Sequence, residues 1–133
     1  MHIRKLFATS ICAAIVLGVG YLAIRSYTRS SYANRAQNLF VLLQAGDYDK
    51  AEGEFLNRGF CKTLEKEWRR LNTELGPFRK STVLQAGPAN DGANKYRVDL
   101  VCDFGETGKR YVIVKYFTND GISSFLMGPK PMR

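Results

Sequence analysis

Side chains that could carry acid–base, nucleophilic or metal chemistry are scarce in this chain of 133 residues. The only histidine, His2, precedes a long apolar run at the N-terminus, which excludes it from a folded active site. Two acids, Asp99 and Asp103, alternate with Tyr96 and the apolar residues that follow it, so they should point away from the core. The sequence has no glycine-rich phosphate loop, no paired-cysteine metal spacing and no serine nucleophile elbow. We therefore expect no catalytic, cofactor or metal site, and we favour a protein without enzymatic activity over a small enzyme.

Cys61 and Cys102 are the only thiols outside the N-terminal apolar run. In an oxidising compartment such a pair can form a disulfide. Cys102 falls on the apolar face of a predicted strand, which the helix that begins near Cys61 should cover. The alternative is two separate buried thiols. A catalytic role for either is disfavoured, because no histidine follows the apolar run to activate it.

Two further groups of side chains could contact partners. An aromatic group could line a pocket for a small apolar ligand, although such residues more often fill a core. The aromatic group consists of Tyr48, Phe55, Trp68, Tyr96 and Phe104. A basic group could contact anionic phospholipid or an acidic partner, although a solvated helix face is the commoner explanation. The basic group consists of Lys66, Arg69, Arg70, Arg79 and Lys80.

The N-terminal segment indicates where the protein works. Arg4 and Lys5 precede an almost unbroken apolar run over residues 6–24, and Arg25 follows it. Because a helix of about 20 residues spans a bilayer, the run is just long enough to be a transmembrane anchor. It is long for a cleaved signal, and its best cleavage site, at residues 18–20, lies inside the run. We predict a single-pass inner-membrane protein with a periplasmic C-terminal domain; the alternative is secretion to the periplasm after cleavage.

The length leaves room for one folded domain after this segment. The predicted organisation is a basic stub (1–5), an anchor or signal segment (6–24), a linker (25–32), a folded domain (33–128) and a C-terminal tail (129–133). The formal net charge of +8 includes four basic residues before the domain. The remaining bias is too mild to indicate nucleic-acid binding, so we expect no nucleic acid among the partners.

Periodicity predicts three helices followed by four strands. The first helix begins near Tyr32, carries apolar residues at helical spacing and ends at Gly46. Asp47 should cap a short second helix, and a third covers residues 62–75. Apolar residues then alternate or run together over the predicted strands 78–85, 95–104, 110–117 and 122–127. The expected fold class is α+β, with three helices packed on a curved four-stranded antiparallel sheet.

This pattern resembles the nuclear-transport-factor-two-like, or cystatin-like, α+β cone superfamily, and more narrowly its small bacterial exported domains. The resemblance rests on the corner at Gly46–Asp49, the element Trp68–Phe78 and the hairpins Tyr96–Met127. It implies a cone-shaped domain. In enzymes of the superfamily an Asp, His or Tyr lies inside the cone.

Three functional hypotheses follow from the sequence. The first is a membrane-tethered accessory domain that binds an envelope protein or a small apolar ligand without catalysis. The second is a cone-fold isomerase or hydrolase that uses Tyr48, Tyr96 or a buried acid. The third is a structural homodimer through an exposed sheet face that carries Val112, Val114 and Tyr116.

Overall fold

The computed structural model describes residues 31–57, 60–92, 94–118 and 121–132, together with Val19 and Leu22; for 60–62 and 118 only the backbone is described. The chain divides into two units, Met1–Ser31 and Tyr32–Arg133. In the first unit Val19 and Leu22 are helical and exposed, and the rest of the predicted anchor lies outside the described residues. No described helix combines the length and the apolar character needed to cross a membrane.

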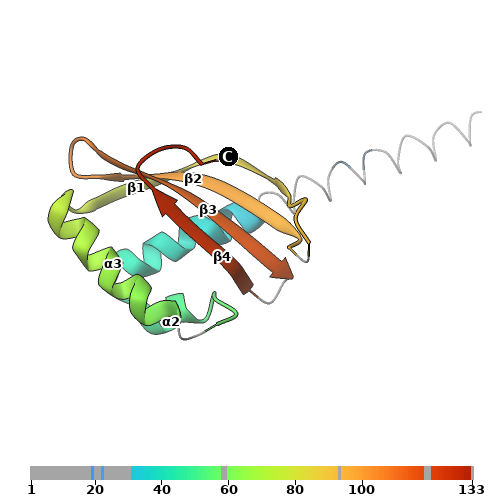
Figure 1. The fold of residues 1–133 in the computed structure, drawn as a ribbon, viewed down its shortest axis with the longest axis horizontal. Helices are drawn as coiled ribbons and strands as arrows, with labels where there is room; N and C mark the ends of the chain where they lie inside the picture. The colour runs from blue at the N-terminus through green and yellow to red at the C-terminus, as the bar shows by residue number, and fades with distance from the viewer. Residues whose placement is uncertain are drawn as a thin grey trace, which may run out of the picture. The chain divides into compact units, whose positions relative to one another are not determined.

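The second unit has the predicted α+β order of three helices and four strands. Its first helix covers residues 31–44 and is followed by α2 (Tyr48–Glu52) and α3 (Phe60–Glu74). The strands are β1 (Phe78–Pro88), β2 (Tyr96–Phe104), β3 (Gly108–Thr118) and β4 (Gly121–Gly128). They form one antiparallel sheet in the order β1-β2-β3-β4, and the helices lie on one side of it (Figure 1).

Helix ends follow from local chemistry. Gly46 adopts φ 75°, and its N–H donates to the carbonyl of Leu43 while that of Asp47 donates to Leu42. This is the left-handed termination that the sequence predicts. Asp47 does occupy the N-cap position of α2, but its side chain makes no capping hydrogen bond. Its carboxylate lies 3.5 Å from the Lys50 ammonium instead.

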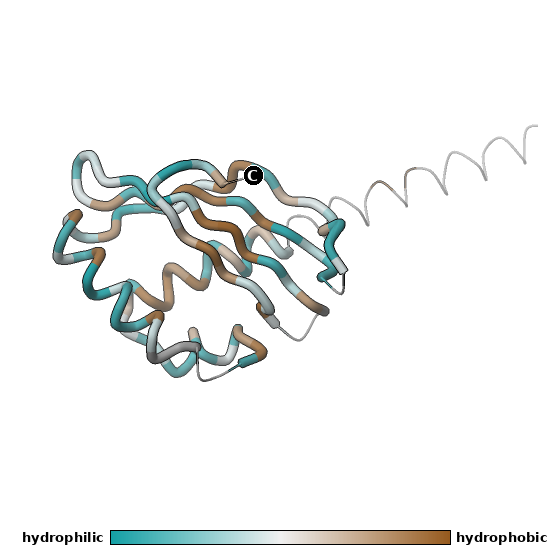
Figure 2. The backbone as a smooth tube through the Cα atoms, in the orientation of Figure 1, coloured by the Kyte–Doolittle hydropathy of each residue, from teal (hydrophilic) through white to brown (hydrophobic). Residues whose placement is uncertain are grey.

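The core forms between the helices and one face of the sheet. Every second residue of β2, from Tyr96 to Phe104, is buried, and the residues between them are half-buried. The helix over residues 31–44 contributes side chains at helical spacing, among them Leu39 and Phe40. Apolar stretches of the strands lie in the middle of the sheet (Figure 2). Asp99 and Asp103 belong to the half-buried set, as predicted.

The prediction that Val112, Val114 and Tyr116 lie on an exposed sheet face is wrong. All three are almost fully buried in the core. The register pairs Val112 with Leu100, and Tyr116 with Tyr96, so these side chains share the helix-facing side of the sheet. The strand is apolar on both faces, and pairing with β2 decides which face is turned inward.

Candidate functional site

A groove of about 370 Å³ lies between α3 and β4. Leu64, Trp68 and Leu71 line it from α3, and Phe125 and Met127 line it from β4. Its volume is at the lower end of the range of small-ligand sites, about 300–1,000 Å³. The five residues named above make the floor apolar, and the volume is large enough for a small apolar group of a ligand.

Local periodicity explains why these side chains converge. Leu64, Trp68 and Leu71 are spaced four and then three residues apart, each close to one helical turn, so they share one stripe of α3. Phe125 and Met127 are two apart in a strand and share one face. The helical wall from Thr63 to Leu71 is about 12 Å long at 1.5 Å per residue, and the strand wall from Phe125 to Gly128 is about 10 Å long. The two walls are therefore similar in length.

Three charged side chains line this groove: Glu67, Arg70 and Arg110. Arg70 is bound to acids, because its guanidinium lies 2.6 Å from the Glu67 carboxylate and 2.8 Å from that of Glu74. Arg70 also holds the pKa of Glu67 below its ordinary value. Arg110 is different, because no described carboxylate pairs with it, and its Nη1 donates to the carbonyl of Lys109 at 2.9 Å. The groove therefore carries one positive charge that no acid of the described residues neutralises.

Register places Arg110 at one end of the groove. It pairs with Cys102 and so belongs to the helix-facing set of β3. The next residue, Tyr111, pairs with Gly128, the last residue of β4. Arg110 thus lies just beyond the C-terminal end of β4, where the strand wall of the groove finishes.

The groove also runs along a sheet edge. β4 is the last strand of the sheet, and the chain itself pairs with the start of that edge through a parallel bridge between Phe55 and Ile122. The N–H of Leu56 donates to the carbonyl of Ile122 at 3.0 Å, and the N–H of Ile122 donates to Glu54 at 2.7 Å. From Ser124 to Gly128 the described residues give β4 only one strand partner, β3.

The aromatic residues that the sequence proposes as a pocket lining do not all meet. Trp68 lines the groove. Phe104 packs against Trp68 with ring centroids 5.5 Å apart, and Phe55 lies 6.0 Å from Phe125. Tyr48 carries the guanidinium of Arg69 over its ring, whereas Tyr96 stacks on Tyr32 at 4.4 Å. Sequence reasoning missed Phe125, Met127 and Arg110. Arg110 is detectable as the charged residue two positions before Val112 on the same face.

A second group of polar atoms surrounds Tyr116. Its hydroxyl is buried and has no hydrogen-bond partner among the described residues. The guanidinium carbon of Arg35 lies 5.0 Å from the Tyr116 ring centroid, and the same guanidinium pairs with Glu54 at 3.2 Å. Burial raises the pKa of Tyr116, and the charge of Arg35 opposes that shift in part.

The predicted basic group is exposed but partly neutralised. Arg69 pairs with Glu65 at 2.8 Å, and Arg70 is bound to two acids as described above. Arg79 donates to the carbonyl of Gly105 at 3.2 Å. Lys66 and Lys80 are exposed. The five residues therefore present less positive charge than their sequence suggests.

Cys102 is a free thiol buried in the core. Burial raises its pKa to about 12, which makes the thiolate inaccessible at neutral pH. Because Cys102 is free, the structure does not contain the disulfide with Cys61 that the sequence allows, and the side chain of Cys61 itself lies outside the described residues.

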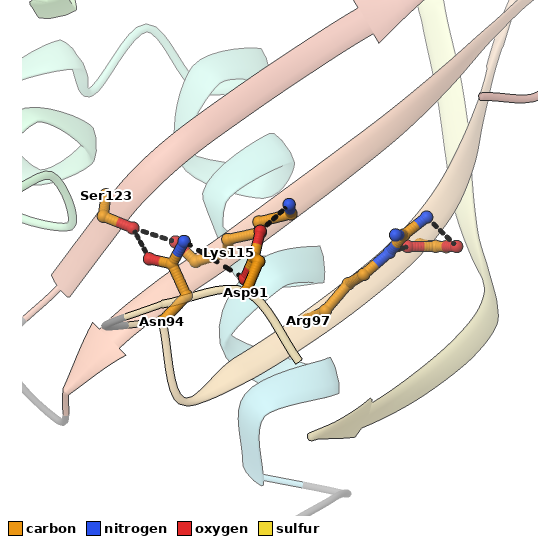
Figure 3. A network of polar contacts seen from close by, with 6 residues as sticks. Asp91, Asn94, Arg97, Lys115 and Ser123 are labelled. Carbon is orange, nitrogen blue, oxygen red and sulfur yellow. Dashed lines mark hydrogen bonds and ion pairs between the residues drawn. The ribbon is translucent and has the colours of Figure 1, made fainter. Parts of the chain in front are cut away.

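The opposite face of the sheet carries a polar hollow of about 620 Å³. Arg97 and Asp99 form a two-bond ion pair there, with nitrogen–oxygen distances of 2.7 and 3.1 Å. The loop between β1 and β2 reaches across the sheet, where Asp91 pairs with Lys115 and Asn94 contacts Ser123 (Figure 3). In the described part of the chain, no three His, Cys, Asp or Glu side chains are placed to hold a metal ion. The charges of this hollow are paired internally.

Comparisons with protein-family models, curated proteins and solved structures returned no match to this chain.

Proposed function

We propose that this chain is a membrane-tethered, extracytoplasmic accessory protein whose folded unit is a non-catalytic binding module. The groove between α3 and β4 takes an apolar group of the bound partner or ligand. The observation that carries this proposal is the groove itself: a hollow of about 370 Å³ with an apolar floor and charged side chains at its margin. Apolar hollows with a few polar groups are the common form of ligand sites.

The charges at the groove favour binding over proton transfer. A general acid or base works best when its pKa lies near the working pH. The carboxylate of Glu67 has a pKa below its ordinary value because of Arg70. It therefore stays ionised at neutral pH and serves to hold Arg70.

The cellular location and the superfamily rest on the sequence. The apolar run over residues 6–24 supports a tether, and the corner, helix and hairpin pattern supports the α+β cone superfamily. Carbonate extraction of membranes that contain the full-length chain tests the tether. Retention of the uncut chain in the membrane supports an anchor, and release of a shortened chain supports secretion after cleavage.

The three methionines provide a direct test of the groove. Met127 lines the groove, whereas Met132 lines the hollow on the other face of the sheet. We expect a neutral apolar fragment, isobutylbenzene, to shift the methyl resonance of Met127 in the full-length chain labelled with ¹³C at methionine methyls. The resonance of Met132 should stay in place. Equal shifts of both signals, or no shift of Met127, would contradict a binding groove at this position.

A further inference from the structure

We infer that the groove binds an extended peptide that ends in an apolar residue and a free C-terminal carboxylate, and that this peptide adds to the edge of β4. The inference rests on the proposed function, because it names the occupant of the same groove. Three features of the described residues carry it: the unpaired strand edge, the direction in which the chain already pairs with that edge, and the position of Arg110.

The edge of β4 is suited to a further strand. An edge strand presents N–H and C=O groups that no neighbour satisfies, and an extended peptide can pair with them. The segment around Phe55 uses this edge at Ile122, with two backbone hydrogen bonds. Beyond it, residues 124–128 have no second strand partner among the described residues. That stretch is the strand wall of the groove.

The direction of the existing pairing decides which peptide terminus reaches Arg110. The bridge between Phe55 and Ile122 is parallel. A peptide that continues in the same direction runs from the Ile122 end of β4 toward Gly128. Its C-terminus then lies beside Arg110, which is just past the end of β4. An antiparallel peptide that ends at the same place would bring its N-terminal ammonium to this guanidinium, and the two like charges would repel each other.

Charge favours a carboxylate at this end. The lining has two arginines and one glutamate, and Arg110 has no acidic partner among the described residues. A guanidinium binds a carboxylate through charge-assisted hydrogen bonds, which are shorter and stronger than those between neutral groups.

The size of the groove sets what fits beside the carboxylate. A water molecule occupies about 30 Å³, so the groove of about 370 Å³ has room for roughly a dozen atoms of similar size. That is enough for one or two apolar side chains, while the peptide backbone lies along the edge above them. The apolar contacts would come from Trp68, Phe125 and Met127.

The experiment uses the full-length chain labelled at methionine methyls, and an acetylated peptide of about five residues that alternates threonine and valine. The peptide ends in valine with a free carboxylate. We expect it to shift Met127 and not Met132, and to bind about tenfold or more tightly than its C-terminal amide. The substitution Arg110→Gln should remove most of this preference. The matched variant Arg79→Gln, of an exposed arginine outside the groove, should leave it unchanged.

Two ligand-side controls need no protein variant and test strand addition. N-methylation of a backbone amide in the middle of the peptide should weaken binding about tenfold or more, because it removes a donor to the edge. Decanoate carries a carboxylate and an apolar chain but no peptide groups. If decanoate binds as well as the peptide and N-methylation has no effect, strand addition is wrong. If isobutylbenzene shifts Met127 but the free-acid peptide does not bind, the inference fails and the binding groove stands; if neither binds, both fail.

Discussion

Replacement of Tyr116 by phenylalanine should stabilise this protein, which is the opposite of the usual effect of a core substitution. The Tyr116 side chain is 0% exposed, and its hydroxyl has no hydrogen-bond partner among the described residues. The substitution removes that oxygen alone. The ring and its contacts with Tyr32 and Arg35, both at 5.0 Å, remain.

The size of the effect follows from the cost of burying an unpaired hydroxyl. Leaving a buried polar group without a partner costs about 1–3 kcal/mol. Part of this gain is lost because a phenylalanine ring attracts the Arg35 guanidinium less strongly than a tyrosine ring does. We expect a net gain of about 1 kcal/mol in the free energy of unfolding. For a unit of roughly 100 residues this corresponds to an increase of about 4–8 °C in Tm.

Urea unfolding of the full-length chain measures this change. Trp68, the only tryptophan, lies in the core and reports the transition. The control is Tyr111→Phe, because Tyr111 is half-buried on the opposite face of the sheet. That variant should differ from the wild type by less than about 0.5 kcal/mol. A loss of about 1 kcal/mol in Tyr116→Phe would refute the reasoning, because it would mean that the hydroxyl is hydrogen-bonded.

The pH dependence provides a second readout of the same group. Burial raises the pKa of Tyr116 above the ordinary value of 10.0. The neutral phenol is therefore favoured in the folded state, and its contribution to stability is complete below pH 10. Above pH 10 the unfolded chain loses the proton first, and stability falls. Because phenylalanine does not titrate, the advantage of Tyr116→Phe should widen above pH 10, by at most about 1.4 kcal/mol per pH unit.

Three further predictions concern the core, a turn and the outer face of the sheet. Cys102 has a pKa raised to about 12 from 9.0, so stability should begin to fall above pH 9, by up to about 1.4 kcal/mol per pH unit, and Cys102→Ala should remove the part of the fall between pH 9 and pH 10, where Tyr116 does not yet contribute, in pH-dependent urea unfolding. Gly105 and Gly92 both have φ near +55° to +58°, but a Cβ would meet a backbone carbonyl only at Gly105. Gly92→Ala should lower the free energy of unfolding by about 1 kcal/mol, and Gly105→Ala should lower it by at least about twice that. Equal losses of Tm in the two variants would contradict this difference. Lys115 lowers the pKa of Asp91, so the hydrogen-exchange protection factors of the loop between β1 and β2, which exclude the pH dependence of intrinsic exchange, should stay constant from pH 7 to pH 4 and fall below it, whereas Asp91→Asn should lower them at all these pH values.

The element order could be predicted because most elements carry a single clear period. Residues of β2 alternate between buried and half-buried from Tyr96 to Phe104, and that alternation is visible in the sequence. The run at Val112–Val114 is apolar on both faces, so its period does not identify the inward side. Only the register with β2, in which Val98 faces Val114, resolves it. The error in placing Tyr116 has this cause.

The groove could be predicted only in part. The sequence predicts Trp68 only as one of five aromatic residues that could line a pocket, and in the structure it lies in the lining of the groove. Its partners Phe125 and Met127 belong to the last strand of the sheet. The distance between a helix and a strand so far apart in sequence depends on tertiary packing, which no local pattern describes. The free edge of β4 likewise follows from strand order and not from the composition of the strand.

Arg110 links the fold to the proposed binding site. It is the only charged residue among the helix-facing positions of β2 and β3, which otherwise carry residues such as Leu100 and Val112. A charge at such a position is costly unless it is solvated or paired. Arg110 meets this condition because it lies where β4 ends and the core opens into the groove. An apolar residue at this position would extend the core. The arginine gives up that packing and instead presents a cation that can bind an anion. Local rules of core formation are often broken at functional positions, and the place of Arg110 in this sheet therefore supports the binding role that we propose for it.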